Sequence, residues 1–162
     1  PVSLTKGIQN AGISIDDISI VINTHLHDDH CGNNRLFKNC VFYVHKDELS
    51  FCKKPHPLDH RYDNYFIEEN EFIELDGDYE IIPGIDVVFS PGHTVGCLSV
   101  VVESISEGKI VITGFCCNDA NFPEKGPAIC PGVHTNAIEA WDSIQRIKNM
   151  NYKILPMHSL DL

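Results

Sequence analysis

Histidine and aspartate side chains are concentrated in one short segment of the chain, residues 25–30, which reads H-L-H-D-D-H. The residues just before it form a short apolar, β-branched run that predicts a buried strand. Because alternate residues of a strand share a face, His25 and His27 are expected to project together past the strand end, with Asp29 and His30 on the following turn. Imidazole and carboxylate groups suit zinc and related divalent ions. The segment therefore predicts part of a metal site, to which other parts of the chain must add ligands.

The elements that must position this segment are predicted to be mixed α and β, with β-hairpins in the middle and helices at both ends. Helices are expected over residues 2–11, over residues 46–52 and after a capping Asn136. Strands are expected over residues 18–23, 41–44, 79–82, 85–89, 97–103, 109–113 and 152–155. Residues 53–72, with Tyr62, Tyr65 and Phe66, are predicted to be a long irregular excursion of the kind that often forms a functional lid.

Two further histidines follow predicted strands far along the chain. Ser90-Pro91-Gly92-His93-Thr94 comes directly after one strand, and Leu155-Pro156-Met157-His158 ends the last one. The remaining histidines, His45, His56, His60 and His134, lie in no such motif, and we expect ordinary surface or loop positions for them.

Taken together, these motifs resemble those of the metallo-β-lactamase superfamily. H-x-H-x-D-H is the superfamily signature, and the segments around His93 and His158 resemble its second and last motifs. The resemblance covers nearly the whole chain. It implies an α/β (α+β) fold, an αββα sandwich with a two-metal site at one edge, formed by a single domain over residues 1–162.

The resemblance also implies the ligands and their roles. It gives two ligand sets: His25, His27 and His93 for the first metal, and Asp29, His30 and His158 for the second. Asp29 is also the expected catalytic residue, because its carboxylate could orient the attacking water or accept a proton. Zinc is the expected metal, as one or two ions, with iron or manganese as alternatives.

One position departs from the family pattern. Members of the family normally carry an aspartate that bridges both metals, expected here at Phe115 or, on a shifted alignment, at Gly114. One metal could then be weak or absent, Cys116 could reach in as an additional thiolate ligand, or Asp119 could substitute. Cys116 and Cys117 could also simply pack as small hydrophobes. Two dications repel unless anions lie between them, so we expect a two-metal site without a carboxylate bridge, or a first site with a weaker second one.

The expected activity is hydrolysis of a lactone, ester, thioester or amide in a small-molecule substrate, by metal-activated water. Asn33-Asn34, the loop near residues 55–63 and Asn121-Phe122 make the chain most similar to the N-acyl homoserine lactonase branch. That branch has a tyrosine shortly after the bridging aspartate, and its nearest counterpart here is Cys117. Two alternatives remain open: a mononuclear iron enzyme resembling sulfur dioxygenases, and a degenerate, non-catalytic metal-binding member.

The start of the chain is a second departure from the family. The family's opening strands precede its first helix, whereas this chain begins at a segment that resembles that helix. Half of one sheet is therefore expected to be absent, replaced or supplied by a partner. An exposed sheet edge favours pairing with another molecule, so a homo-oligomer formed through that edge is one expectation.

Composition excludes several classes of partner. The formal net charge of -11 argues against nucleic-acid binding, which needs clustered lysine and arginine. No apolar run approaches the roughly 18 residues of a membrane span. The seven cysteines form no C-x-x-C pair and no signal peptide is visible, so we expect reduced thiols and a cytoplasmic location.

Overall fold

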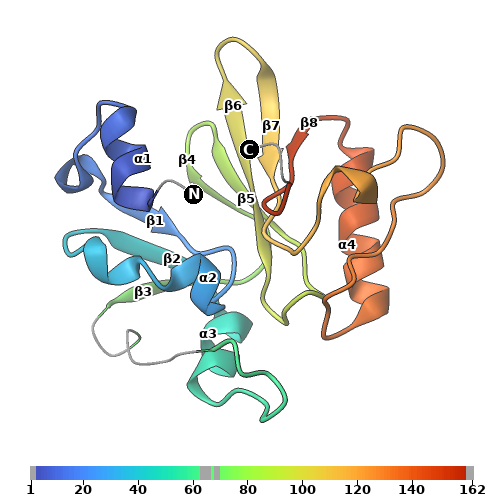
Figure 1. The fold of residues 1–162 in the computed structure, drawn as a ribbon, viewed down its shortest axis with the longest axis horizontal. Helices are drawn as coiled ribbons and strands as arrows, with labels where there is room; N and C mark the ends of the chain where they lie inside the picture. The colour runs from blue at the N-terminus through green and yellow to red at the C-terminus, as the bar shows by residue number, and fades with distance from the viewer. Residues whose placement is uncertain (1–2, 63–66, 68–69, 160–162) are drawn as a thin grey trace.

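The first half of the protein is built on a small parallel sheet. The computed structural model describes residues 3–62, 67 and 70–159 (Figure 1). Three strands pair in the order β1 (Ile20–Ile22), β2 (Val41–His45) and β3 (Phe72–Leu75), all parallel. Three helices belong to this half of the chain: α1 (Leu4–Asn10), α2 (Asp28–Cys31) and α3 (Lys46–Lys53).

The second half is a larger, mostly antiparallel sheet. Its strands follow the order β4 (Tyr79–Ile82), β5 (Ile85–Phe89), β6 (Leu98–Ser104), β7 (Gly108–Ile112) and β8 (Lys153–Leu155). Only β7 and β8 are parallel, and the long helix α4 (Ala137–Asn149) lies between them in the sequence, because parallel neighbours need a crossover connection. Three short 3-10 turns, Ile15–Asp17, Asn34–Leu36 and Asp119–Asn121, complete the described elements.

Three apolar clusters stack the elements into four layers. One joins α2 and α3 to the small sheet through residues such as Leu26, Val44 and Leu49. A second fills the space between the two sheets and includes Leu75, Val87 and Leu98. A third packs α4 against the outer face of the larger sheet, with residues that include Val88, Val101, Val111, Ile144 and Ile147. The order helix, sheet, sheet, helix is the αββα sandwich that the sequence predicts.

Most predicted elements are confirmed. Asn136 caps α4, because its side-chain oxygen accepts from the backbone nitrogens of Ile138 and Glu139. The excursion expected over residues 53–72 ends in a strand that was not predicted, since β3 begins at Phe72. The expectations for Tyr65 and Phe66 fall outside the described residues. No helix in the described part of the chain combines the length and the apolar character needed to cross a membrane.

The expected surface or loop position is wrong for His45. Its side chain is 2% exposed, its ring stacks on Phe89 at 4.2 Å, and its Nδ1 accepts from the backbone nitrogen of Asp47 at the start of α3. This histidine therefore caps a helix and packs between the two sheets, a role that depends on the tertiary structure.

Candidate metal centre

Three buried histidines from two strand ends converge on one point. His25 and His27 follow β1, and His93 follows β5. Their ring centroids lie 4.6 Å apart for His25 and His27, 4.8 Å for His25 and His93, and 5.0 Å for His27 and His93. Each ring offers one donor atom within 4.8 Å of the others. Two sheets thus bring together the first ligand set that the resemblance implies.

A second group of donors shares His25 with the first. His25, Asp29 and His30 have donor atoms within 4.8 Å of one another, and the rings of His25 and His30 are 3.9 Å apart. Asp29 lies in the first turn of α2, and its side chain is 63% exposed. Its carboxylate therefore faces the solvent side of the centre. His158 lies next to this group, with its ring 5.5 Å from that of His30. The structure therefore brings all six predicted ligands to one region.

The outer nitrogens of two ligand rings are held by neighbouring oxygens. Nδ1 of His93 lies 2.8 Å from the carbonyl oxygen of Val133, and Nδ1 of His25 lies 3.3 Å from Oγ1 of Thr24. Nε2 of His25 is buried without a hydrogen-bond partner among the described residues. Buried nitrogens are rarely left unpaired, so this one fits a metal ion. Such contacts on the second nitrogen are also typical of metal-binding histidines.

Burial keeps the candidate ligands neutral. It lowers the pKa of His25 well below 6.5, with the neighbouring histidines adding to the effect, and it lowers the pKa of His93. Burial, followed by the charge of Arg61, lowers the pKa of His27 to about 4. Burial likewise lowers the pKa of His30 to about 4. Metal binding requires neutral imidazole, so the four rings are in the form that a cation needs at neutral pH.

A buried carboxylate joins the two loops that carry the first ligand set. Glu48, in α3, is fully buried and accepts from the backbone nitrogen of Leu26 at 2.9 Å and from that of Gly96 at 3.1 Å. The hydroxyl of Tyr62 donates to the same carboxylate at 2.8 Å. Burial raises the pKa of Glu48, and these hydrogen bonds oppose the rise. A Cβ at Gly96 would lie 2.4 Å from the backbone nitrogen of Glu48, so only glycine allows this approach.

The loop before the undescribed residues also reaches the centre. Asp59 forms a two-fold ion pair with Arg61, and Oδ2 of Asp59 lies 3.5 Å from Nε2 of His27. The ring of Tyr62 packs edge-on against His27 at 4.7 Å. Sequence reasoning missed Glu48, Asp59 and Arg61 as parts of the site. Nothing in their spacing marks them, because the contacts of Asp59 and Arg61 depend on how the loop folds back onto α2, and those of Glu48 depend on the packing of α3 against both ligand loops.

At the position of the family's bridging aspartate, this chain has residues that pack against the protein interior. Phe115 is buried in the cluster beneath α4, and a Cβ at Gly114 would lie 1.8 Å from the carbonyl oxygen of Leu98. Cys116 belongs to neither donor group among the described residues, and burial raises the pKa of its thiol. Asp119 is exposed and accepts from Oγ of Ser159 at 2.5 Å. Among the described residues, neither Cys116 nor Asp119 joins the two donor groups.

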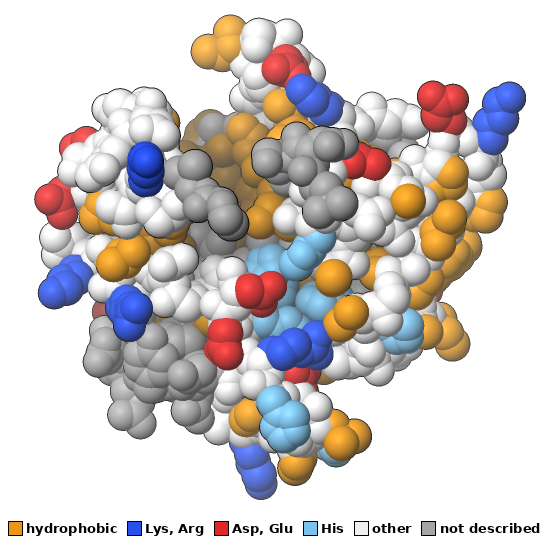
Figure 2. Space-filling model, in the orientation of Figure 1, with side chains coloured by type: hydrophobic (Ala, Val, Ile, Leu, Met, Phe, Trp, Pro, Cys, Tyr) orange, Lys and Arg blue, Asp and Glu red, His pale blue; other side chains and the backbone are white. Residues whose placement is uncertain are grey.

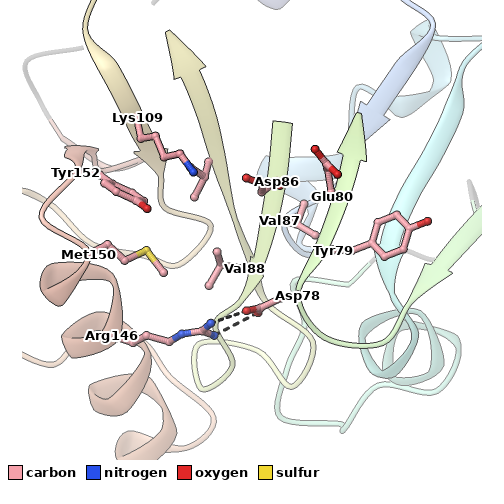
Figure 3. A pocket seen from close by; sticks show the side chains of 11 residues that line it. Asp78, Tyr79, Glu80, Asp86, Val87, Val88, Lys109, Arg146, Met150 and Tyr152 are labelled. Atoms are coloured by element: carbon pink, nitrogen blue, oxygen red, sulfur yellow. Dashed lines mark hydrogen bonds and ion pairs between the residues drawn. The ribbon is translucent and has the colours of Figure 1, made fainter. Parts of the chain in front are cut away.

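The centre lies at the surface between the two halves. Histidine side chains gather near the middle of the face shown in Figure 2. A cavity of about 340 Å³ adjoins them, lined by residues that include Cys116, Asn118, Asn121, Val133 and His158. A different cavity of about 350 Å³ lies between α4 and the outer face of the larger sheet, where Arg146 pairs with Asp78 (Figure 3). That cavity lacks both donor groups and is not the metal centre.

A metal centre at one edge of an αββα sandwich defines the class to which the fold and site belong. The family model described as "Metallo-beta-lactamase superfamily" matches residues 3–158 of this chain. The chain therefore belongs to the metallo-beta-lactamase superfamily.

Within the superfamily, the chain is similar in sequence to several individual proteins. The chain is 31% identical over 161 residues to the N-acyl homoserine lactonase AiiA of Bacillus thuringiensis subsp. kurstaki, covering 93% of this chain and 58% of that protein. A probable metallo-hydrolase of Methanocaldococcus jannaschii is 28% identical over 155 residues, covering 96% of this chain and 64% of that protein. Both are longer, so the chain spans less than two thirds of the relatives' length.

A solved structure shows the same fold. An N-acyl homoserine lactone hydrolase, with the product N-hexanoyl-L-homoserine bound at its catalytic metal center, superposes with a TM-score of 0.80 at 25% identity. The match covers 98% of this chain and 62% of that one. The αββα architecture is therefore shared by the lactonase-like branch and this protein.

Proposed function

We propose that this protein is a metal-dependent hydrolase that cleaves a small lactone or a related ester, thioester or amide. The observation that carries the proposal is the convergence of two donor groups that share His25, one buried and one open to solvent. The names of the relatives, lactonases and a metallo-hydrolase, support the same chemistry. A lactone is the preferred substrate class because of this similarity.

The proposed residues have two roles: six of them would bind metal ions, and one of these six, Asp29, would also accept a proton. His25, His27 and His93 would hold the first ion, and Asp29, His30 and His158 a second. A divalent ion bound there would supply hydroxide at neutral pH and a Lewis acid for the substrate carbonyl. Asp29 is the catalytic residue of the proposal, since its exposed carboxylate can orient the attacking water and accept its proton.

Zinc is the metal that we propose, because a set of imidazoles with one carboxylate matches its ligand chemistry. The two sites should differ in strength. The first set is fully buried, whereas the second relies on the exposed Asp29 and lacks a bridging carboxylate. Without an anion between them, two dications repel, so we propose that the first site binds zinc more tightly.

The cavity beside His158 is the space that we propose for the substrate. It combines apolar side chains such as Ile129 and Val133 with the polar Asn118 and Asn121. Ligand sites are commonly concave and mostly apolar, with a few polar groups that fix orientation. This lining suits a small molecule with both a polar head and an apolar part.

Metal analysis and a substrate panel test the proposal together. The purified protein should hold one to two zinc ions per chain and hydrolyse at least one of a lactone, a thioester and an ester. A chelator should abolish that activity, and added zinc should restore it. The conservative variant Asp29→Asn should retain the first zinc and lose most of the activity.

Three results would contradict the proposal. One iron per chain would favour the oxygenase, and no metal would favour a degenerate member. Activity that survives a strong chelator would exclude metal-activated water.

A further inference from the structure

We propose that Arg61 is a specificity-determining residue of this site, whose guanidinium binds a carboxylate that the substrate carries beside its reacting carbonyl. The inference rests on the proposed hydrolase function and names a narrower substrate class within it. The preferred substrates are lactones that bear a second, anionic group, and neutral lactones of the same shape are poorer ones.

The ion pair between Arg61 and Asp59 has a definite orientation at the centre. Asp59 is the inner partner, because its side chain is 9% exposed and its Oδ2 lies 3.5 Å from Nε2 of His27. The guanidinium is the outer partner and is 42% exposed. The backbone of Arg61 is also attached to the ligand turn, because its carbonyl accepts from the backbone nitrogen of Asp28 at 2.9 Å. The pair therefore presents its positive end to solvent beside the first ligand set.

One edge of the guanidinium remains available to a ligand. Nε lies 2.7 Å from Oδ1 of Asp59 and Nη2 lies 2.7 Å from Oδ2, whereas Nη1 makes no hydrogen bond to a described residue. A guanidinium has five N–H donors, so the edge formed by Nη1 and Nη2 can still donate twice. Two parallel donors match the two oxygens of a carboxylate. A single guanidinium balances the one charge of a carboxylate, whereas a phosphate group carries about -1.5 to -2.

The charge around the site favours the same ligand. The formal net charge of -11 repels anions, so an anionic substrate needs a local positive charge. Burial is the largest cause of the pKa shifts of His27, His93 and Cys116, and the charge of Arg61 lowers the pKa of all three. Cys116 also lines the cavity that we propose for the substrate. The guanidinium therefore acts on both the first ligand set and that cavity, and Figure 2 shows a basic side chain at the border of the gathered histidines.

Kinetics with two matched substrates test the inference. A γ-butyrolactone with a carboxylate on its γ carbon is compared with the corresponding primary amide, using zinc-loaded protein. Arg61→Gln should lower kcat/KM for the carboxylate about 10–100-fold, mainly through KM, because a contact to a non-reacting group is the same in the ground state and the transition state. Hydrolysis of the amide should be unchanged. Arg61→Lys keeps the charge without the two-donor edge and should fall between Arg61→Gln and the wild type.

The matched control is Arg146→Gln. Arg146 also pairs with an aspartate, Asp78, but it lines the cavity beside α4 that lacks both donor groups. This variant should keep the wild-type ratio of kcat/KM between the carboxylate and the amide. An effect of any variant on the metal centre itself would lower both substrates together and leave this ratio unchanged.

A binding measurement does not depend on turnover. Cyclopentanecarboxylate, a ring analogue without a bond to hydrolyse, is added to zinc-loaded protein. The Nε–Hε NMR signal of Arg61, assigned by its absence from Arg61→Gln, should shift with this carboxylate and stay in place with cyclopentanecarboxamide.

The outcomes separate this inference from the proposed function. An Arg61 signal that does not move, or equal losses for carboxylate and amide in Arg61→Gln, would overturn the inference. Failure to hydrolyse either lactone would also overturn it, even if the zinc-loaded protein cleaved a thioester and so kept the proposed function. A wild-type protein that binds no zinc would overturn the proposed function itself.

Discussion

Four of the six candidate ligands, His25, His27, His30 and His93, contribute through their burial as much as through their chemical type. Imidazoles that stay neutral well below their ordinary pKa of 6.5 can hold a cation in mildly acidic conditions, where exposed histidines would be protonated. The same burial makes the rings costly to protonate. Zinc affinity and the dependence of stability on pH should therefore report on the site without any substrate.

His93 offers a direct test at the scale of one residue. His93→Ala removes a ligand of the first set, so zinc affinity should fall by more than the roughly 10–100-fold that loss of an outer partner causes. His134→Ala is the matched control, because Nδ1 of His134 also lies 2.8 Å from a backbone oxygen but the residue is in neither donor group. Chelator competition measures both variants. Equal losses would contradict the assignment.

The metal-free protein should lose stability as the pH falls. His27 and His30 have a pKa of about 4 when folded, against about 6.5 when unfolded. Between these values the unfolded chain binds more protons, so the free energy of unfolding decreases toward acid, by up to about 1.4 kcal/mol per pH unit for each histidine. Urea unfolding in the presence of a chelator, at pH 7 and pH 5, measures the slope. Stability that does not change over this interval would contradict the pKa directions.

Between elements, the main constraint at the centre is the carboxylate of Glu48. It holds Leu26, between two ligands, and Gly96, three residues after His93. Glu48→Gln places an amide donor against backbone donors, and leaving buried groups unpaired costs about 1–3 kcal/mol each. We expect the free energy of unfolding to fall by about 2–4 kcal/mol in urea unfolding.

The control for this variant is Glu139→Gln, an exposed acid in the first turn of α4. A surface change of this kind should alter the free energy of unfolding by less than about 0.5 kcal/mol. If Glu48→Gln were equally mild, the joining role of Glu48 would be wrong.

How far the sequence predicts the structure differs between kinds of element. The strands that end in ligands were predicted because apolar runs and strand alternation are local properties. β3 was missed because Phe72–Leu75 lacks regular alternation and its pairing with β2 is long-range. Asp59 was missed for a related reason: its two neighbours, Arg61 and His27, come together only when the loop folds onto α2.

For the whole molecule, a bound cation should raise the free energy of unfolding with the logarithm of its concentration. A ligand that binds only the folded state adds about 2.7 kcal/mol at one hundred times its dissociation constant and about 4.1 kcal/mol at one thousand times. The thermal midpoint should therefore rise through a zinc titration and return with a chelator. Magnesium prefers oxygen ligands and serves as the control. A midpoint unaffected by zinc would contradict the metal centre.

The assembly and location of the molecule stay predictions. In the described part of the chain, β1 and β3 are the edges of the small sheet, and pairing of two copies through an edge is testable by light scattering. None of the seven cysteines, all of which lie in the described part of the chain, forms a disulfide, and the cytoplasmic location stays a prediction.

The ligands belong to both sheets, and this has a mechanical consequence. His25, His27 and His30 follow β1 of the small sheet, while His93 and His158 follow β5 and β8 of the large one. A single ion held by His25, His27 and His93 would therefore join two sheets that also contact each other through apolar side chains around Leu75 and Leu98 and through the hydrogen bonds of Glu48. Zinc binding should therefore slow amide hydrogen exchange along the whole interface between the two sheets, including backbone amides that do not contact the ion.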